Sequence, residues 1–167
     1  LNSNNLSNII NSNKSFFIFV ALIILFLSYL ALPNIYNKAE IRKELKEQLL
    51  NNFSLNFDLT QNLNYNFFPR PHFVNENLSI ITNQNKISDI KKIKFYISLN
   101  SFFSLENITI KKVVIENANF NLNNQNYNFF TKILNGNFQN KILEIKDSNV
   151  FYRNFDKEVL FINKIIN

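Results

Sequence analysis

The segment FFIFVALIILFLSYLAL, residues 16–32, decides how the rest of this chain is interpreted. It contains no charge, proline or glycine, and Ser28 and Tyr29 are its only mildly polar members. As a helix rising 1.5 Å per residue it would extend about 26 Å, close to the roughly 30 Å hydrocarbon thickness of a bilayer. The segment therefore predicts one transmembrane helix over residues 16–32.

A cleaved signal peptide is the alternative interpretation of this segment. Signal peptides end in small residues just before the cleavage point. Tyr29 occupies the position where a small residue would be needed for cleavage after Ala31. We therefore expect an uncleaved membrane anchor.

Residues 1–15 are rich in Asn and Ser and predict a disordered tail. The chain has no Met, so we expect that Leu1 is not a translation start and that the sequence is a fragment of a longer protein, with a processed form as the alternative. Asn, Ile, Lys and Phe are abundant and have AT-rich codons. We attribute much of the Asn excess to base composition, with a prion-like Asn-rich segment as the alternative.

The charges around the apolar segment leave its orientation open. Only Lys14 precedes it, whereas Lys38, Arg42, Lys43 and Lys46 follow closely. By the positive-inside rule this count puts the C-terminal side in the cytoplasm, although long translocated domains override the rule.

Residues 38–52, KAEIRKELKEQLLNN, predict an amphipathic helix. Ile41, Leu45 and Leu49 recur every four residues and form one apolar stripe. We expect this stripe to pack on the domain that follows. A membrane-surface helix is the alternative, but its polar face would be mainly basic, and here it is mixed.

From Phe53 onward the apolar period changes to two, which predicts strands. Residues 53–59 and 63–67 form a predicted strand pair, and the shift of alternation at Lys111–Lys112 predicts a β-bulge. The predicted fold class is mainly β. It comprises the transmembrane helix, the amphipathic helix and an antiparallel curved sheet over residues 53–167, incomplete at its C-terminus.

No constellation of residues for catalysis or metal binding is found in the sequence. There is no Cys, and the single histidine, His72, is predicted to be a partly exposed loop residue. The residues Asp58, Asp89, Asp147 and Asp156 have no metal-ligand spacing, and Gly136 is the only glycine. The aromatic residues share the apolar phase of the predicted strands, and the lysines lie in the other phase. A nucleic-acid-binding platform would instead combine surface aromatics with a basic stripe. We expect no enzyme activity, no cofactor and no nucleic-acid partner.

The apolar face of the strands allows two interpretations. It can be the core of a sandwich that a second sheet closes. It can also be an open, curved trough that holds acyl chains. Both predict the same alternation.

Three stretches, taken with the N-terminal span that ends in Pro33, resemble the N-terminal region of the AsmA family of Gram-negative envelope proteins. The first is the aromatic-Pro-x-Pro turn and strand FPRPHFVNENLSI, residues 68–80. The second is IKKIKFYISLNSFFSLENITIKKVVIENANFNL, residues 90–122, and the third is LEIKDSNVFYRNFDKEVLFINKI, residues 143–165. The resemblance extends from Phe16 to the end of the sequence.

The resemblance implies a single-pass inner-membrane protein with its β domain in the periplasm and a role in outer-membrane biogenesis. Its implied partners are phospholipid or another acyl-chain lipid, the inner membrane and envelope assembly proteins. The lipid would bind or move along an apolar β-groove. The groove residues expected are Phe53, Leu55, Phe57, Leu59, Leu63, Tyr65, Phe67, Ile93, Phe95, Ile97, Leu99, Ile108 and Ile110.

Two other functions are compatible with the sequence. One is a non-enzymatic scaffolding β-domain on a membrane anchor, which supports assembly or targeting of envelope proteins and has a closed apolar face. The other is an anchored hydrolase with its active site beyond residue 167.

Overall fold

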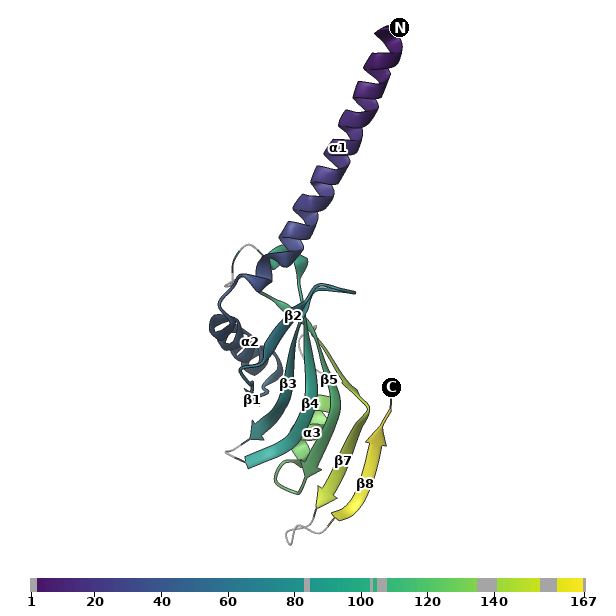
Figure 1. Cartoon of the computed structure of the whole chain (residues 1–167). Coiled ribbons are helices and arrows are strands. Elements are labelled where there is room, and N and C mark those ends of the chain that lie inside the picture. Colours follow the sequence, from purple (N-terminus) through teal and green to yellow (C-terminus); the bar gives the residue numbers. More distant parts are fainter. Residues whose placement is uncertain are drawn as a thin grey trace.

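A computed structural model describes residues 3–82, 85–102, 104, 108–134, 141–153 and 159–166. A long helix projects from one end of a curved sheet (Figure 1). The elements in chain order are α1 (Ser3–Ala31), η1 (Leu32–Asn34), α2 (Lys38–Phe53), β1 (Phe57–Asp58), β2 (Leu63–Asn66), β3 (His72–Thr82), β4 (Asn85–Ile97), η2 (Leu99–Ser101), β5 (Ile110–Leu122), α3 (Tyr127–Leu134), β6 (Ile142–Lys146), β7 (Ser148–Arg153) and β8 (Val159–Ile165).

Helix α1 contains the predicted apolar helix and extends beyond it toward the N-terminus. The stretch Lys14–Asn34, which continues from α1 into η1, is long and apolar enough to cross a membrane, and hardly any of it is buried against the rest of the chain. The structure differs from the expected disordered tail, because residues from Ser3 onward are helical. Once the apolar segment has nucleated the helix, each added residue gains a backbone hydrogen bond at little further cost.

Helix α2 confirms the predicted amphipathic helix and its packing. Asn37 caps its N-terminus, where the Asn37 Oδ1 accepts from the Ala39 N–H at 2.9 Å. Ser54 ends it with a left-handed backbone, φ 53°. One stripe of the helix is fully buried against the sheet: Ile41, Leu45, Leu49 and Phe53.

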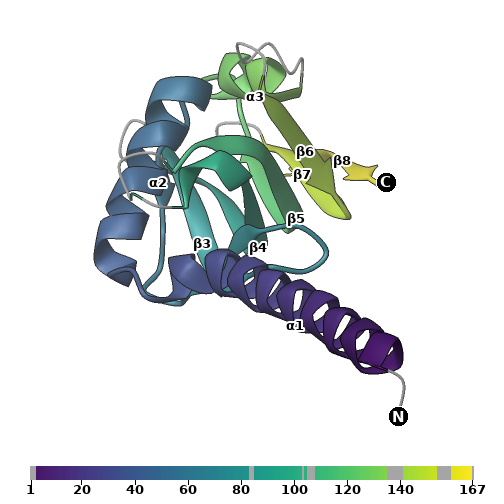
Figure 2. The same cartoon turned by 90° about the horizontal axis from the view of Figure 1, so that it is seen from above.

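The sheet is curved and mixed, with strand order β1-β3-β4-β5-β7-β8. Strand β2 also pairs with β3, and β6 with β5. The expectation of a wholly antiparallel sheet is wrong at one place, because β6 and β7 both run parallel to β5. Parallel neighbours need a crossover connection, and α3 lies in it. Figure 2 shows the sheet curving between α2 and α3.

Strands β1 and β2 do not form the expected pair with each other. Both pair antiparallel with β3, Phe57 opposite Ile80 and Leu63 opposite Asn75. The buried Asn75 side chain fills the gap between the two short strands. It accepts from the Thr60 N–H at 3.0 Å and donates to the Thr60 and Asn62 carbonyls at 3.1 Å each. The amide therefore substitutes for the ladder bonds that an unbroken edge strand would make.

Two irregularities in the strands set which side chains face the core. The register of β4 and β5 shifts so that Tyr96 pairs with Lys112 but Ile97 with Ile110. Lys111 is thus the extra residue, which confirms the predicted bulge. The second irregularity is a transverse line of left-handed residues: Asn77 in β3 and Asn117 in β5, each φ 55°, and Asp147 between β6 and β7, φ 46°.

The core side chains change phase along this line of left-handed residues. In β3 the residues with the least exposure are Phe73 and Asn75 before Asn77, then Leu78 and Ile80 after it, whereas His72 and Val74, also buried, lie in the other phase. The same change occurs in β5 at Asn117, in β4 beside Lys91, and at Asp147. Because β3, β4, β5 and the junction of β6 with β7 change phase at one level, the strand pairing stays in register and the apolar face remains continuous.

Candidate functional site: the apolar face and the junction with α1

The structure places most of the predicted groove residues in a closed core. Nine of the thirteen are buried. These nine are Phe53, Leu55, Phe57, Leu63, Ile93, Phe95, Ile97, Ile108 and Ile110. The apolar stripe of α2 belongs to the same cluster. The expectation that these side chains line an open groove is therefore corrected, because the apolar stripe of α2, which ends in Phe53, packs with the others in one buried cluster.

Gln48 fixes α2 to the sheet by hydrogen bonds to backbone. Its Nε2 donates to the Ile108 carbonyl, and its Oε1 accepts from the Ile110 N–H at 2.9 Å. The amide reproduces the donor–acceptor pair that a neighbouring strand would offer to the start of β5. The helix is thus held over the apolar face by specific polar contacts as well as by its apolar stripe.

The four remaining predicted groove residues lie at the edge of the core. Leu59 and Tyr65 are half-buried and pack against it. Phe67 is 50% exposed and Leu99 is 45% exposed. Phe67 follows β2 and Leu99 begins η2, so both lie at the end of the domain that meets α1.

Three tyrosines join α1 and the segment after it to this end of the domain. The Tyr29 hydroxyl donates to the Leu99 carbonyl, and the Tyr36 hydroxyl to the Phe102 carbonyl. The Tyr65 hydroxyl donates to the Leu30 carbonyl at 2.8 Å.

The buried Phe102 ring lies at the centre of this junction. Its centroid is 5.3 Å from that of Tyr29 and 6.3 Å from that of Tyr65. Burial, with a smaller contribution from Tyr29, raises the pKa of Tyr65 to about 12. Tyr65 therefore stays a protonated donor toward α1 at any physiological pH.

The apolar face is less completely covered on the last strands. Leu143 in β6, Tyr152 in β7 and Ile165 in β8 pack against the buried cluster but are only partly buried. The strand pairing places them in the inward phase, with Leu143 opposite the buried Val113 and Ile165 opposite the buried Ser148. On these strands the inner face is only partly covered by the residues that the structure describes.

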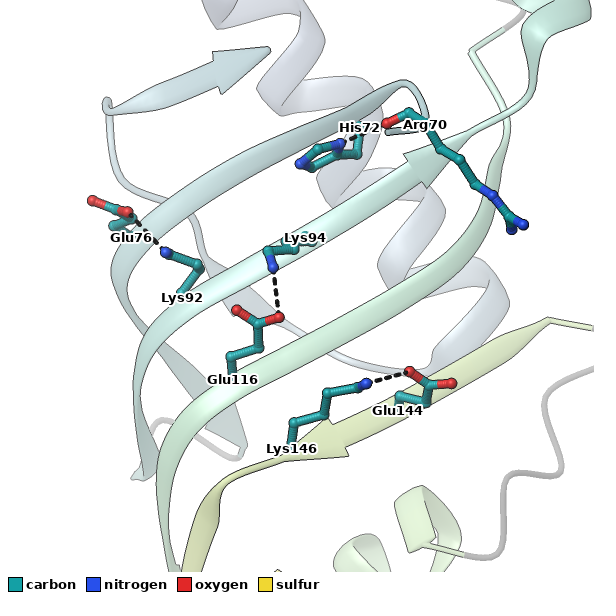
Figure 3. A network of polar contacts seen from close by, with 8 residues as sticks. All are labelled: Arg70, His72, Glu76, Lys92, Lys94, Glu116, Glu144 and Lys146. Atoms are coloured by element: carbon teal, nitrogen blue, oxygen red, sulfur yellow. Dashed lines mark hydrogen bonds and ion pairs between the residues drawn. The ribbon is translucent and has the colours of Figure 1, made fainter. Parts of the chain in front are cut away.

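The opposite face of the sheet carries a grid of charged side chains (Figure 3). One row across four strands alternates in sign: Glu76, Lys92, Glu116 and Lys146. Lys92 Nζ lies 3.8 Å from Glu76 Oε1, and Lys94 Nζ lies 2.6 Å from Glu116 Oε1. Opposite charges on neighbouring strands favour this register over a slipped one.

Glu144 completes the grid on β6. Its Oε1 accepts from Lys112 Nζ at 2.7 Å, and its Oε2 lies 3.7 Å from Lys146 Nζ. The hydrogen bond from Lys112 and the two positive charges lower the pKa of Glu144, against a smaller opposing effect of burial. The carboxylate is therefore ionised at neutral pH and serves as a structural ion-pair partner.

The single histidine differs from its expected loop position. His72 is the first residue of β3 and only 6% exposed. Its Nδ1 lies 2.7 Å from the Arg70 carbonyl oxygen, and its ring stacks on Tyr96 at 5.1 Å. Among the residues that the structure describes, no group of three or more His, Cys, Asp and Glu side chains could hold a metal ion. Asp156 lies outside the described residues.

Comparisons with known proteins add no relative to this description: no family model, curated protein or solved structure matches the chain.

Sequence reasoning missed the tyrosine junction and the left-handed line. Tyr29, Tyr36 and Tyr65 lie 70, 66 and 35 residues from their hydrogen-bond partners in the chain, and a lone Tyr in an apolar phase looks like any other core residue. The line of left-handed residues has a weak signal in the sequence. The dipeptide Glu-Asn occurs at 76–77 and again at 116–117, and at both places it interrupts the strict alternation of apolar and polar residues.

Proposed function

We propose that this chain is an inner-membrane-anchored envelope protein that binds the acyl chains of phospholipid on its curved sheet and contributes to outer-membrane biogenesis. It acts by binding and not by catalysis. The single observation that carries the proposal is the incomplete covering of the apolar face at Leu143, Tyr152 and Ile165, which continues directly from the closed core.

The membrane anchor in this proposal is α1, which is long and apolar enough to cross a bilayer. The closed part of the core begins at the junction with α1 and lies under α2. The half-covered part lies farther along the sheet, on β6, β7 and β8 (Figure 1). We infer that α2 closes the membrane-proximal end of the apolar face and that lipid binds beyond it.

A photo-crosslinking amino acid at position 165 tests lipid binding. Ile165 is on the inner face of β8, and its neighbour Lys164 is exposed on the outer face. We expect a phospholipid adduct at 165 in cells and none at 164. No adduct at 165, or equal adducts at both positions, would contradict the proposal.

The periplasmic placement rests on the AsmA resemblance, against the charges that flank α1. Protease treatment of spheroplasts tests it, because a periplasmic β domain is digested while a cytoplasmic one is protected. Protection of the β domain in intact spheroplasts, with digestion after lysis, would overturn the placement.

A scaffolding β-domain is the second candidate, favoured by the closed core under α2. Its contact surface would be the outer face, where Ile162 is 63% exposed beside the half-buried Phe151. A crosslinker at 162 that captures one envelope protein, together with no lipid adduct at 165, would favour this function.

A further inference from the structure

Large apolar side chains are exposed at the end of the β domain that meets α1. Ile35 and Phe68 are each 79% exposed, Phe67 50% and Leu99 45%. We call these four residues the junction rim. Monomeric proteins seldom leave apolar surface grouped in this way without a partner.

The tyrosine contacts hold the junction rim against the end of α1. Ile35 directly precedes Tyr36, Phe67 lies two residues after Tyr65, and the Leu99 carbonyl accepts from Tyr29. In both views the connection from β2 to β3, which carries Phe67 and Phe68, projects beside the lower end of α1 (Figures 1 and 2).

The length of the apolar segment determines how deep in the bilayer the tyrosine contacts lie. Lys14–Asn34 has 21 residues, and the hydrocarbon core of a bilayer needs about 20 helical residues. If Asn34 marks the boundary, Tyr29 and Leu30 lie on the order of 8 Å inside it. Tyr29 donates a hydrogen bond to the Leu99 carbonyl, and the Leu30 carbonyl accepts one from Tyr65, so both contacts with the β domain lie at this depth. This end of the domain must therefore reach the bilayer surface.

We propose that the junction rim is embedded where the headgroups meet the hydrocarbon of the bilayer that α1 spans; the inference rests on the membrane anchorage in the proposed function. Phe67 and Phe68 lie at the depth where amphipathic and aromatic side chains gather. The exposed Arg70 follows them and can pair with lipid phosphate. The occupant of this surface is thus the phospholipid interface, and not a protein.

A tryptophan reporter tests the depth, because the chain has no Trp of its own. Phe68→Trp is made in the full chain, reconstituted in nanodiscs of phosphatidylethanolamine and phosphatidylglycerol. Ile162→Trp on β8 is the matched control, an exposed apolar residue remote from α1 in sequence and at the other end of the strand order. Each fluorescence is quenched in parallel by brominated lipid and by aqueous iodide.

For Phe68→Trp we expect blue-shifted emission and several-fold stronger quenching by brominated lipid than for Ile162→Trp, with weaker iodide quenching. Iodide quenching of both variants alike, in discs that retain the protein, would overturn the inference. Shielding from iodide without quenching by brominated lipid would also overturn it and would indicate a protein partner. Failure of both variants to enter nanodiscs would instead overturn the membrane anchorage.

Discussion

Asn77 and Asn117 lie at the same level of the sheet, on either side of Lys91, and both have a left-handed backbone with φ 55°. Asn is one of the few residues with a side chain that tolerates this conformation. The two strands therefore change phase together, and the core residues on both sides of this level stay on one face.

Asn117→Val tests this line of left-handed residues. A β-branched residue resists the left-handed conformation, so we expect a loss of about 1–2 kcal/mol in unfolding free energy. Asn117→Gly should be close to neutral, since Gly adopts it freely. The control is Lys91→Val, an exposed residue on the neighbouring strand that is absent from the left-handed set. Chemical unfolding in detergent, followed by circular dichroism, measures all three; equal losses for Asn117→Val and Lys91→Val would contradict the prediction.

Gln48→Leu tests the polar contacts between α2 and β5. The Ile110 N–H and the Ile108 carbonyl would lose their partner, and we expect a loss of about 1–3 kcal/mol in unfolding free energy. Glu47→Leu, at an exposed position of the same helix, should change stability by less than about 0.5 kcal/mol. Amide exchange should also quicken at Ile110 in the Gln48 variant alone. Unchanged amide protection at Ile110 would contradict the prediction, because it would show that water replaces the Gln48 side chain without a loss of stability.

Tyr65→Phe removes the donor to the Leu30 carbonyl and retains the ring. We expect a loss of about 0.5–1.5 kcal/mol in unfolding free energy at neutral pH. The pKa of Tyr65 is raised to about 12, from its ordinary value of 10.0. Its stabilisation is therefore fully present below pH 10 and is lost as the pH rises toward 12. The stability difference between the wild type and the variant should shrink over that window. A constant difference would contradict this assignment of the pKa.

Glu144→Gln tests the charge grid through acid sensitivity. The pKa of Glu144 is lowered, chiefly by the hydrogen bond from Lys112, so its stabilisation is present at neutral pH and is lost as the pH falls below about 4.5. The side chains of the pair are about a third exposed, which limits the effect to within about 1 kcal/mol. The variant should show a flatter stability profile on the acid side. A profile parallel to the wild type would show that the pair contributes nothing.

The sequence predicted the parts of the fold that have a simple period. The spacing of Ile41, Leu45 and Leu49 placed α2 and its buried face correctly, and the double lysine placed the bulge. It did not reveal the parallel pairing of β6 and β7 with β5, because pairing partners leave no periodic signal. Helix α3 was missed although Tyr127, Phe130 and Leu134 have helical spacing, because it is only eight residues long.

The candidate site was predicted less well than the fold. Alternation identifies which side chains share a face but not what covers that face, and α2 covers most of it. The Asn residues were attributed to base composition, yet Asn75 replaces missing ladder bonds, and Asn77 and Asn117 supply backbone conformations that few other residues allow. Such roles depend on partners distant in the chain, so composition alone did not reveal them.

The hydrogen bonds of the three tyrosines couple the orientation of α1 to the orientation of the sheet. A helix whose apolar length exceeds the local bilayer thickness responds by tilting. Because α1 and the segment after it are bonded to the domain at Leu99, Phe102 and Tyr65, a tilt of the helix would rotate the whole β domain with it. If α1 spans a membrane, as proposed, the thickness of that membrane would then influence the direction in which strands β7 and β8 point.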